Sequence, residues 1–311
     1  MINKAKLERL YRKYNRREFV HPDPVEFLYG YEDLCDREIV AFVASSLAYG
    51  RVAQIHKSVA RALQRMIPSP SVFLQKVAYE KIHRTFADYK HRVTTGQKFA
   101  CMLFGLKQII ERYGSLQACF LTGLNNEASP PVRVGVLPYG SASQPGKEKG
   151  HSCIAPLDPA LPGGGSALRQ HFVRGEHAGH DTILPALTTF TTELTTCAND
   201  KLGHLVPCPT NGSACKRLNL FLRWMVRHDQ VDPGGWEDVP ASKLIVPVDI
   251  HMHRVCLSLG LTRRKQADMR TALEITEAFR EIATEDPVRY DFVLTRRAIR
   301  GEADLIAFLT A

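Results

Sequence analysis

Hydrophobic residues recur at three- and four-residue steps through much of this chain, and that spacing limits the folds open to it. In residues 34–66 the spacing indicates two helices, because Gly50 interrupts an otherwise continuous apolar face. Residues 97–113, 182–197 and 270–282 repeat the pattern, and the first of these ends directly before a glycine. The sequence therefore predicts an all-α protein.

One region differs in character from the helical ones. Residues 129–166 contain seven prolines and seven glycines and have little apolar periodicity. We interpret 125–180 as a mobile insertion between a helical part at 1–124 and a second helical part at 181–311. Such an insertion costs a folded domain little, because loop-closure entropy grows only slowly with loop length.

Composition places limits on the location and the partners of the chain. It carries 41 Lys and Arg against 32 Asp and Glu, and the resulting net charge of +9 and pI near 9.2 favour polyanionic partners such as nucleic acid. No stretch approaches the roughly 18 apolar residues that a membrane span needs. The eight cysteines are scattered without a CxxC pair, so neither a disulfide framework nor a zinc ribbon is indicated. We expect a cytoplasmic, monomeric protein without a membrane partner, metal or cofactor.

Helix signals are unusually complete between residues 207 and 228. Two prolines precede Gly212, which permits a tight turn, and Ser213 is a good helix N-cap. Since no glycine or proline follows before His228, we predict a helix from Ala214 to His228. One face of this helix is apolar and should be buried. A second stripe faces either water or phosphate and consists of Lys216, Leu220, Arg223 and Arg227.

The turn at Gly212 and Ser213 has a physical implication of its own. The first turn of a helix leaves backbone N–H groups unpaired and carries partial positive charge, which suits a phosphate. A turn that leads into a basic helix is therefore suited to anchor the backbone of a nucleic acid. The alternative interpretation is that Ser213 merely caps a core helix.

A second element with possible chemistry is Asp249. The apolar run 244–248 leads into this residue, and helical spacing resumes after it. Asp249 is thus predicted to be the N-cap or a first-turn residue of a new helix, where the helix dipole favours an ionised carboxylate. A lone aspartate in such a position is usually only a cap. In combination with Lys216, it suggests a nucleophilic amine with a carboxylate partner.

The two segments together resemble the helix-hairpin-helix superfamily of DNA base-excision glycosylases. In that superfamily a glycine-rich hairpin leads into a helix with a catalytic lysine, and a Val-Asp-Thr-His segment followed by an arginine supplies the catalytic aspartate. Residues 211–217, Asn-Gly-Ser-Ala-Cys-Lys-Arg, resemble the first element, and residues 247–255, Pro-Val-Asp-Ile-His-Met-His-Arg-Val, resemble the second more closely. The hairpin keeps one glycine, and 32 residues separate Lys216 from Asp249. Both features resemble the archaeal 8-oxoguanine glycosylase branch, which has a degenerate hairpin and a similarly long separation. The segments 213–236 and 286–294 are also similar to an uncharacterised bacterial family related to that branch.

This resemblance covers residues 1–124 and 181–311 and implies two helical lobes with a helix-hairpin-helix motif at the cleft between them. It implies a glycosylase with lyase activity that removes an oxidised purine, with 8-oxoguanine favoured, from double-stranded DNA. Lys216 would form a Schiff base with the sugar, and Asp249 would assist it. The chain has no C-terminal cluster of four cysteines, so the iron–sulfur variant is not implied. DNA contacts are implied for Asn211, Gly212, Ser213, Ala214, Arg217, Arg223 and Arg51.

The target base must leave the duplex stack and enter a pocket. Phe221, Trp224 and Tyr49 are candidates to line that pocket, and core packing is the alternative for each of them. The segment 45–51 occupies the place that approaches the minor groove in such glycosylases. Arg51, at its end, is either a phosphate contact or an ordinary surface arginine.

Two other function classes stay open on the sequence. The first is a metal-dependent hydrolase, in which Asp249, His251 and His253 form a DxHxH ligand set. Alternating ligands normally lie on a strand, however, and this segment continues with helical spacing. The second is a nucleic-acid-binding protein that keeps the glycosylase-like scaffold and performs no chemistry, because a lysine and an aspartate in sequence do not by themselves make a competent pocket.

Overall fold

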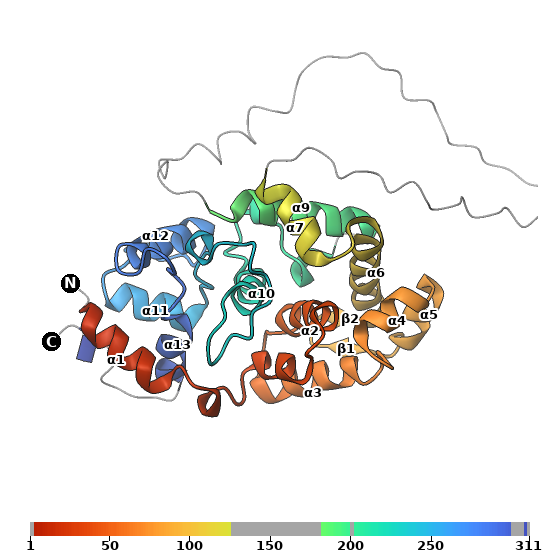
Figure 1. The fold of residues 1–311 in the computed structure, drawn as a ribbon, viewed down its shortest axis with the longest axis horizontal. Coiled ribbons are helices and arrows are strands. Elements are labelled where there is room, and N and C mark those ends of the chain that lie inside the picture. Colours follow the sequence, from red (N-terminus) through yellow and green to blue (C-terminus); the bar gives the residue numbers. More distant parts are fainter. Residues whose placement is uncertain (1–2, 126–181, 200–201, 300–307, 310–311) are drawn as a thin grey trace, which may run out of the picture. The chain divides into compact units, whose positions relative to one another are not determined.

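Helices make up nearly all of the regular structure in the computed structural model, which describes residues 3–125, 182–199, 202–299 and 308–309 (Figure 1). The α-helices are α1 (Lys4–Tyr14), α2 (Leu34–Ser46), α3 (Val52–Leu63), α4 (Pro70–Lys76), α5 (Tyr79–Thr85), α6 (Gly96–Tyr113), α7 (Leu116–Leu124), α9 (Leu184–Cys197), α10 (Lys216–Val226), α11 (Ile250–Ser258), α12 (Met269–Arg280) and α13 (Asp291–Ile299). Short 3-10 helices are η1 (Arg17–Phe19), η2 (Pro24–Gly30), η3 (Gly203–Leu205), η4 (Pro209–Asn211) and η5 (Ala241–Lys243). Strands β1 (Lys90–His91) and β2 (Thr94–Thr95) form one antiparallel pair. The protein is all-α, as predicted.

Glycines break the helices where the sequence predicts. The chain leaves α2 at Ser46 and enters α3 at Val52, and Gly50 between them has a φ of 98°, which a residue with a side chain rarely adopts. In the same way α6 ends at Tyr113, and Gly114 follows it with a φ of 92°. The predicted insertion lies outside the described residues apart from its first residue. Contacts group the described residues on both sides of the insertion into one unit.

Helix α2 is almost completely buried. From Ile39 to Leu47 no residue is more than 2% exposed, and the helix packs against η2, α4 and α10. Phe42 of α2 meets Phe221 of α10 with ring centroids 5.2 Å apart, and Phe221 meets Trp236 at 5.1 Å. The two sequence segments on either side of the insertion therefore share one core, and α10 is fixed against its central helix.

A buried carboxylate joins the same two segments. Glu38 on α2 accepts hydrogen bonds from the first amides of α7, at Leu116 (3.0 Å) and Gln117 (3.1 Å), and from the indole of Trp236 (2.7 Å). Burial raises the pKa of Glu38, and these three donors oppose that rise. Because the donors come from distant parts of the chain, Glu38 holds the segment that follows α10 in place.

Helix α9 packs along α6 and α7. Gly123 of α7 approaches it so closely that a Cβ there would lie 2.8 Å from atoms of Ala186 and Thr189. A small residue is therefore required at this crossing. None of the described helices combines the length and the apolar character needed to cross a bilayer.

Candidate active site

Helix α10 begins later than the sequence predicts. Ser213 is not its N-cap: the cap position belongs to Cys215, whose φ of 48° is left-handed and whose side chain makes no capping hydrogen bond. The Ser213 hydroxyl instead accepts from the amide of Cys215, and the buried Cys215 thiol lies against the carbonyl of Pro207. The helix therefore starts directly at Lys216, so the side chain of this lysine emerges from the first turn.

The turn before α10 is held by backbone pairing with a remote segment. The amide of Met269 donates to the carbonyl of Gly212 at 3.0 Å, and Ser213 forms an antiparallel bridge with Asp268. Gly212 itself is left-handed, with a φ of 76°. Since these contacts come from the start of α12, the position of Lys216 is set by tertiary structure as well as by the local turn.

Asp249 occupies the N-cap of α11, as predicted. The run that precedes it is buried, with Ile245 and Val246 each 1% exposed, and the amide of Val246 donates to the Thr276 hydroxyl of α12. The Asp249 side chain accepts from the amide of Met252 at 2.8 Å through Oδ1. One carboxylate oxygen is thus fixed by the helix it caps, and the other faces away from that bond.

Lys216 and Asp249 meet in the structure. The Lys216 Nζ lies 3.1 Å from Oδ2 of Asp249, and the two side chains are 33% and 22% exposed. Burial acts to raise the pKa of Asp249, but the Lys216 ammonium and the Met252 amide outweigh it, so the pKa is below its ordinary value. The carboxylate is therefore ionised at neutral pH, in contact with a partly accessible amine.

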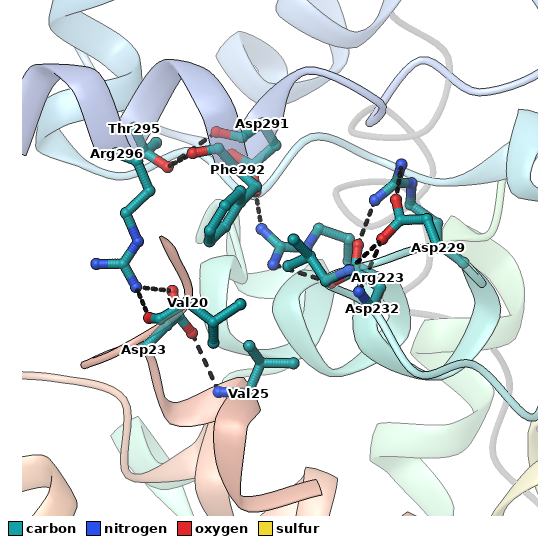
Figure 2. A network of polar contacts seen from close by, with 12 residues as sticks. Val20, Asp23, Val25, Arg223, Asp229, Asp232, Asp291, Phe292, Thr295 and Arg296 are labelled. Atoms are coloured by element: carbon teal, nitrogen blue, oxygen red, sulfur yellow. Dashed lines mark hydrogen bonds and ion pairs between the residues drawn. The ribbon is translucent and has the colours of Figure 1, made fainter. Parts of the chain in front are cut away.

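A buried ionic network fixes the other end of α10 (Figure 2). Arg223, seven residues after Lys216, donates to Asp232 at 3.0 and 3.1 Å and to Asp291 at 2.5 Å. Asp232 is also bound by Arg227, which reaches Asp286 at 2.9 Å. Because Asp291 begins α13 and α13 packs against α11, the network links the helix that carries Lys216 to the helix that Asp249 caps.

The prediction that Arg223 contacts DNA is wrong. Arg223 is 2% exposed, and its guanidinium is enclosed between Asp232 and Asp291, so no phosphate can reach it. Arg227, on the same predicted stripe, is 4% exposed. Both arginines of this stripe therefore face carboxylates of the protein, whereas Lys216 and Leu220 are partly exposed.

Arg217 is engaged by the protein as well, though it is only half-buried. Its guanidinium donates to the carbonyl of Ser46 at 2.6 Å and to the carbonyl of His204, and it lies 4.9 Å from the ring of Tyr49. Burial lowers the pKa of Arg217. Arg217 thereby ties the start of α10 to the end of α2, and its contact with DNA stays a prediction.

The other predicted DNA contacts differ in accessibility. Asn211 and Ser213 are exposed on the turn, Gly212 is half-buried, and Ala214 is 7% exposed. Arg51 is exposed at the N-cap of α3. Asn211, Ser213 and Arg51 can therefore be reached by a ligand, and their role stays a prediction.

The three candidate pocket aromatics have different surroundings. Phe221 and Trp224 are fully buried and belong to the core. Tyr49 is half-buried, and its hydroxyl lies 2.7 Å from Oγ1 of Thr94 and donates to the carbonyl of His91 at 2.9 Å. Of the three, only Tyr49 has surface that a ligand could contact.

The DxHxH segment is the first turn of α11. His251 is exposed, and His253 donates through Nε2 to the carbonyl of Arg264 at 2.8 Å. Asp249 is engaged by Met252 and Lys216. In the part of the chain that the structure describes, no three His, Cys, Asp or Glu side chains are grouped as metal ligands would be. These donors therefore do not form the converging ligand set that a catalytic metal requires.

The chain matches the model of one protein family. Residues 23–137 and 163–300 match a family described as "Protein of unknown function (DUF2400)". The chain belongs to this family. The match includes both Lys216 and Asp249 and leaves out residues 138–162, which lie within the predicted insertion. Comparison with curated proteins and with solved structures gave no match.

Proposed function

We propose that this member of the DUF2400 family is a DNA base-excision glycosylase with lyase activity. The observation that carries the proposal is the 3.1 Å contact between the Lys216 amine and the Asp249 carboxylate. The two residues are far apart in sequence, and the pair is partly accessible. The net charge of +9 is suited to a polyanionic substrate.

The proposed chemistry begins with cleavage of the bond between C1′ of the deoxyribose and the damaged base. The transition state carries positive charge on the sugar, as in other glycoside cleavages, and an ionised Asp249 would stabilise that charge. The base departs with the bonding electron pair and takes up a proton that the Lys216 ammonium releases. The amine so freed attacks C1′, and the surplus proton on its nitrogen passes to Asp249.

Strand cleavage follows from the resulting Schiff base. Opening of the sugar ring leaves a C=N bond between C1′ and the lysine nitrogen, and loss of a C2′ proton then expels the 3′ phosphate by β-elimination. Hydrolysis of the C=N bond regenerates the Lys216 amine. This sequence of steps requires no oxidant, reductant or cofactor.

We further propose an oxidised purine, with 8-oxoguanine favoured, as the target base, because the 32-residue separation of Lys216 from Asp249 and the hairpin with one glycine resemble the archaeal 8-oxoguanine glycosylase branch. The test is an assay of base release and strand nicking on otherwise identical duplexes that contain 8-oxoguanine, uracil or no lesion. Release and nicking are expected on the 8-oxoguanine duplex alone. A protein that binds all three duplexes and releases no base from any would overturn the proposal and leave the binding protein as the function.

A further inference from the structure

The connection between α11 and α12 carries a cluster of positive charge that the catalytic proposal does not use. We call residues 261–267, Leu-Thr-Arg-Arg-Lys-Gln-Ala, the basic loop. Its three consecutive cations differ in environment: Arg263 and Lys265 are exposed, whereas Arg264 between them is half-buried. The loop therefore has one inward cation and two outward ones.

Internal hydrogen bonds give the basic loop a fixed shape. The guanidinium of Arg264 donates to Asp268 at 2.7 Å and to the Thr271 hydroxyl at 2.9 Å. The backbone of Arg264 donates from its amide to Thr262 at 3.1 Å and accepts from His253 at 2.8 Å. Arg264 thus fixes the backbone of the loop. These hydrogen bonds do not involve the side chains of Arg263 and Lys265, which remain at the surface.

The outward cations, Arg263 and Lys265, have no ion-pair partner in the part of the chain that the structure describes. The acidic groups that face the loop are engaged: Asp268 binds Arg264, and Glu274 accepts from the Thr262 hydroxyl at 3.1 Å. An open pocket of about 270 Å³ is lined by Arg264, Lys265 and Gln266. A rigid loop with two unpaired cations is complementary to a polyanion.

The basic loop is also attached to both halves of the candidate active site. It follows α11, the helix capped by Asp249. Immediately after the loop, Asp268 and Met269 pair with Ser213 and Gly212 in the turn that precedes Lys216. A strand of nucleic acid that reaches Lys216 across this turn would therefore pass close to the loop.

We propose that the basic loop is a backbone-phosphate contact for DNA, in which Arg263 and Lys265 bind phosphates next to the Lys216 site. The proposal rests on the proposed function for the identity of the polyanion. Because both contacts are ionic and involve no base edge, they contribute to damaged and undamaged duplexes alike.

The test compares two double variants of the full chain that change the net charge equally. One is Arg263→Gln with Lys265→Gln. The control is Lys57→Gln with Lys81→Gln, which alters exposed lysines on α3 and α5. Affinity for an 8-oxoguanine duplex and for its undamaged counterpart is measured from low to moderate salt. The slope of log affinity against log salt is expected to fall by about 1 for each lost phosphate contact, hence by about 2 in the loop variant, on both duplexes. The control should keep the wild-type slope.

Two results would overturn the proposal: a loop variant that keeps the wild-type slope, or equal changes in both double variants, which would reflect net charge alone. The variant Arg263→Lys with Lys265→Arg retains both charges and should have the wild-type slope. That result would show that the lower slope of the loop variant comes from lost charge and not from misfolding. The outcome is independent of catalysis. A lowered slope in a protein that releases no base would support the loop contact and refute only the glycosylase chemistry.

Discussion

If the proposed mechanism holds, the Asp249→Asn variant is expected to release 8-oxoguanine at least about 100-fold more slowly than the wild type. In that mechanism the negative charge of Asp249 stabilises the sugar cation and accepts the lysine proton. Asparagine caps a helix about as well as aspartate, so the hydrogen bond to the Met252 amide can persist and α11 should stay folded. The measurement is a single-turnover assay of base release, with DNA affinity and urea unfolding followed in parallel.

A suitable control is Asp33→Asn, since Asp33 caps α2 by accepting from the Asp36 amide and has no ion pair among the described residues. This variant also loses one negative charge at a helix N-cap and should release base at the wild-type rate. If Asp249→Asn instead loses stability or DNA affinity in proportion to activity, then Asp249 mainly maintains the fold, and its catalytic role is refuted.

The second large effect is expected on stability. Asp232 is fully buried and binds the guanidinium groups of Arg223 and Arg227. When Asp232 is removed, Arg223 keeps Asp291 and Arg227 keeps Asp286, but the guanidinium N–H groups that Asp232 bound lose their acceptor in the interior. Asp232→Ala should therefore lower the free energy of unfolding by about 3 kcal/mol. Since Arg223 also links α10 to Asp291 on α13, base release should decline as well.

The matched comparison is Asp88→Ala. Asp88 binds Arg65 through two hydrogen bonds of 2.6 and 2.9 Å, but its side chain is 72% exposed. Water screens such a pair, and its loss should barely move the urea midpoint. Equal midpoints for Asp232→Ala and the wild type would show that the buried network contributes little to the stability of α10.

The helices could be predicted because their causes are local. Apolar spacing defines α2, α3 and α6 within single windows, and a glycine that can adopt positive φ marks the break after α2 and the end of α6. Asp249 could be predicted as a cap for the same reason, because an aspartate directly before resumed helical spacing is a local signal.

The start of α10 depends on distant residues instead. A left-handed backbone is unfavourable for a cysteine, so the sequence around Cys215 gives no sign of it. The surrounding contacts maintain it: the thiol lies against Pro207, and the preceding turn pairs with the start of α12. Ser213, which has the better local propensity for a cap, is therefore left outside the helix.

The environment of Arg223 could not be inferred either. Periodicity assigned it to a polar stripe, but a stripe does not reveal whether its partner is solvent, phosphate or a protein carboxylate. One partner, Asp291, lies 68 residues further along the chain. The same limit applies to the Lys216–Asp249 contact, because the spacing of the two residues does not determine whether the connecting segment folds back.

The most direct test of the central proposal is borohydride trapping on an 8-oxoguanine duplex. Borohydride reduces the C=N bond of the Schiff base to a stable amine, so the wild type should become covalently attached to DNA, and proteolysis with mass spectrometry should locate the adduct on Lys216. Lys216→Gln should give no adduct, whereas the exposed-lysine control Lys81→Gln should be trapped as the wild type is. A wild-type protein that cannot be trapped, or an adduct that persists in Lys216→Gln, would contradict the assignment of Lys216 as the nucleophile.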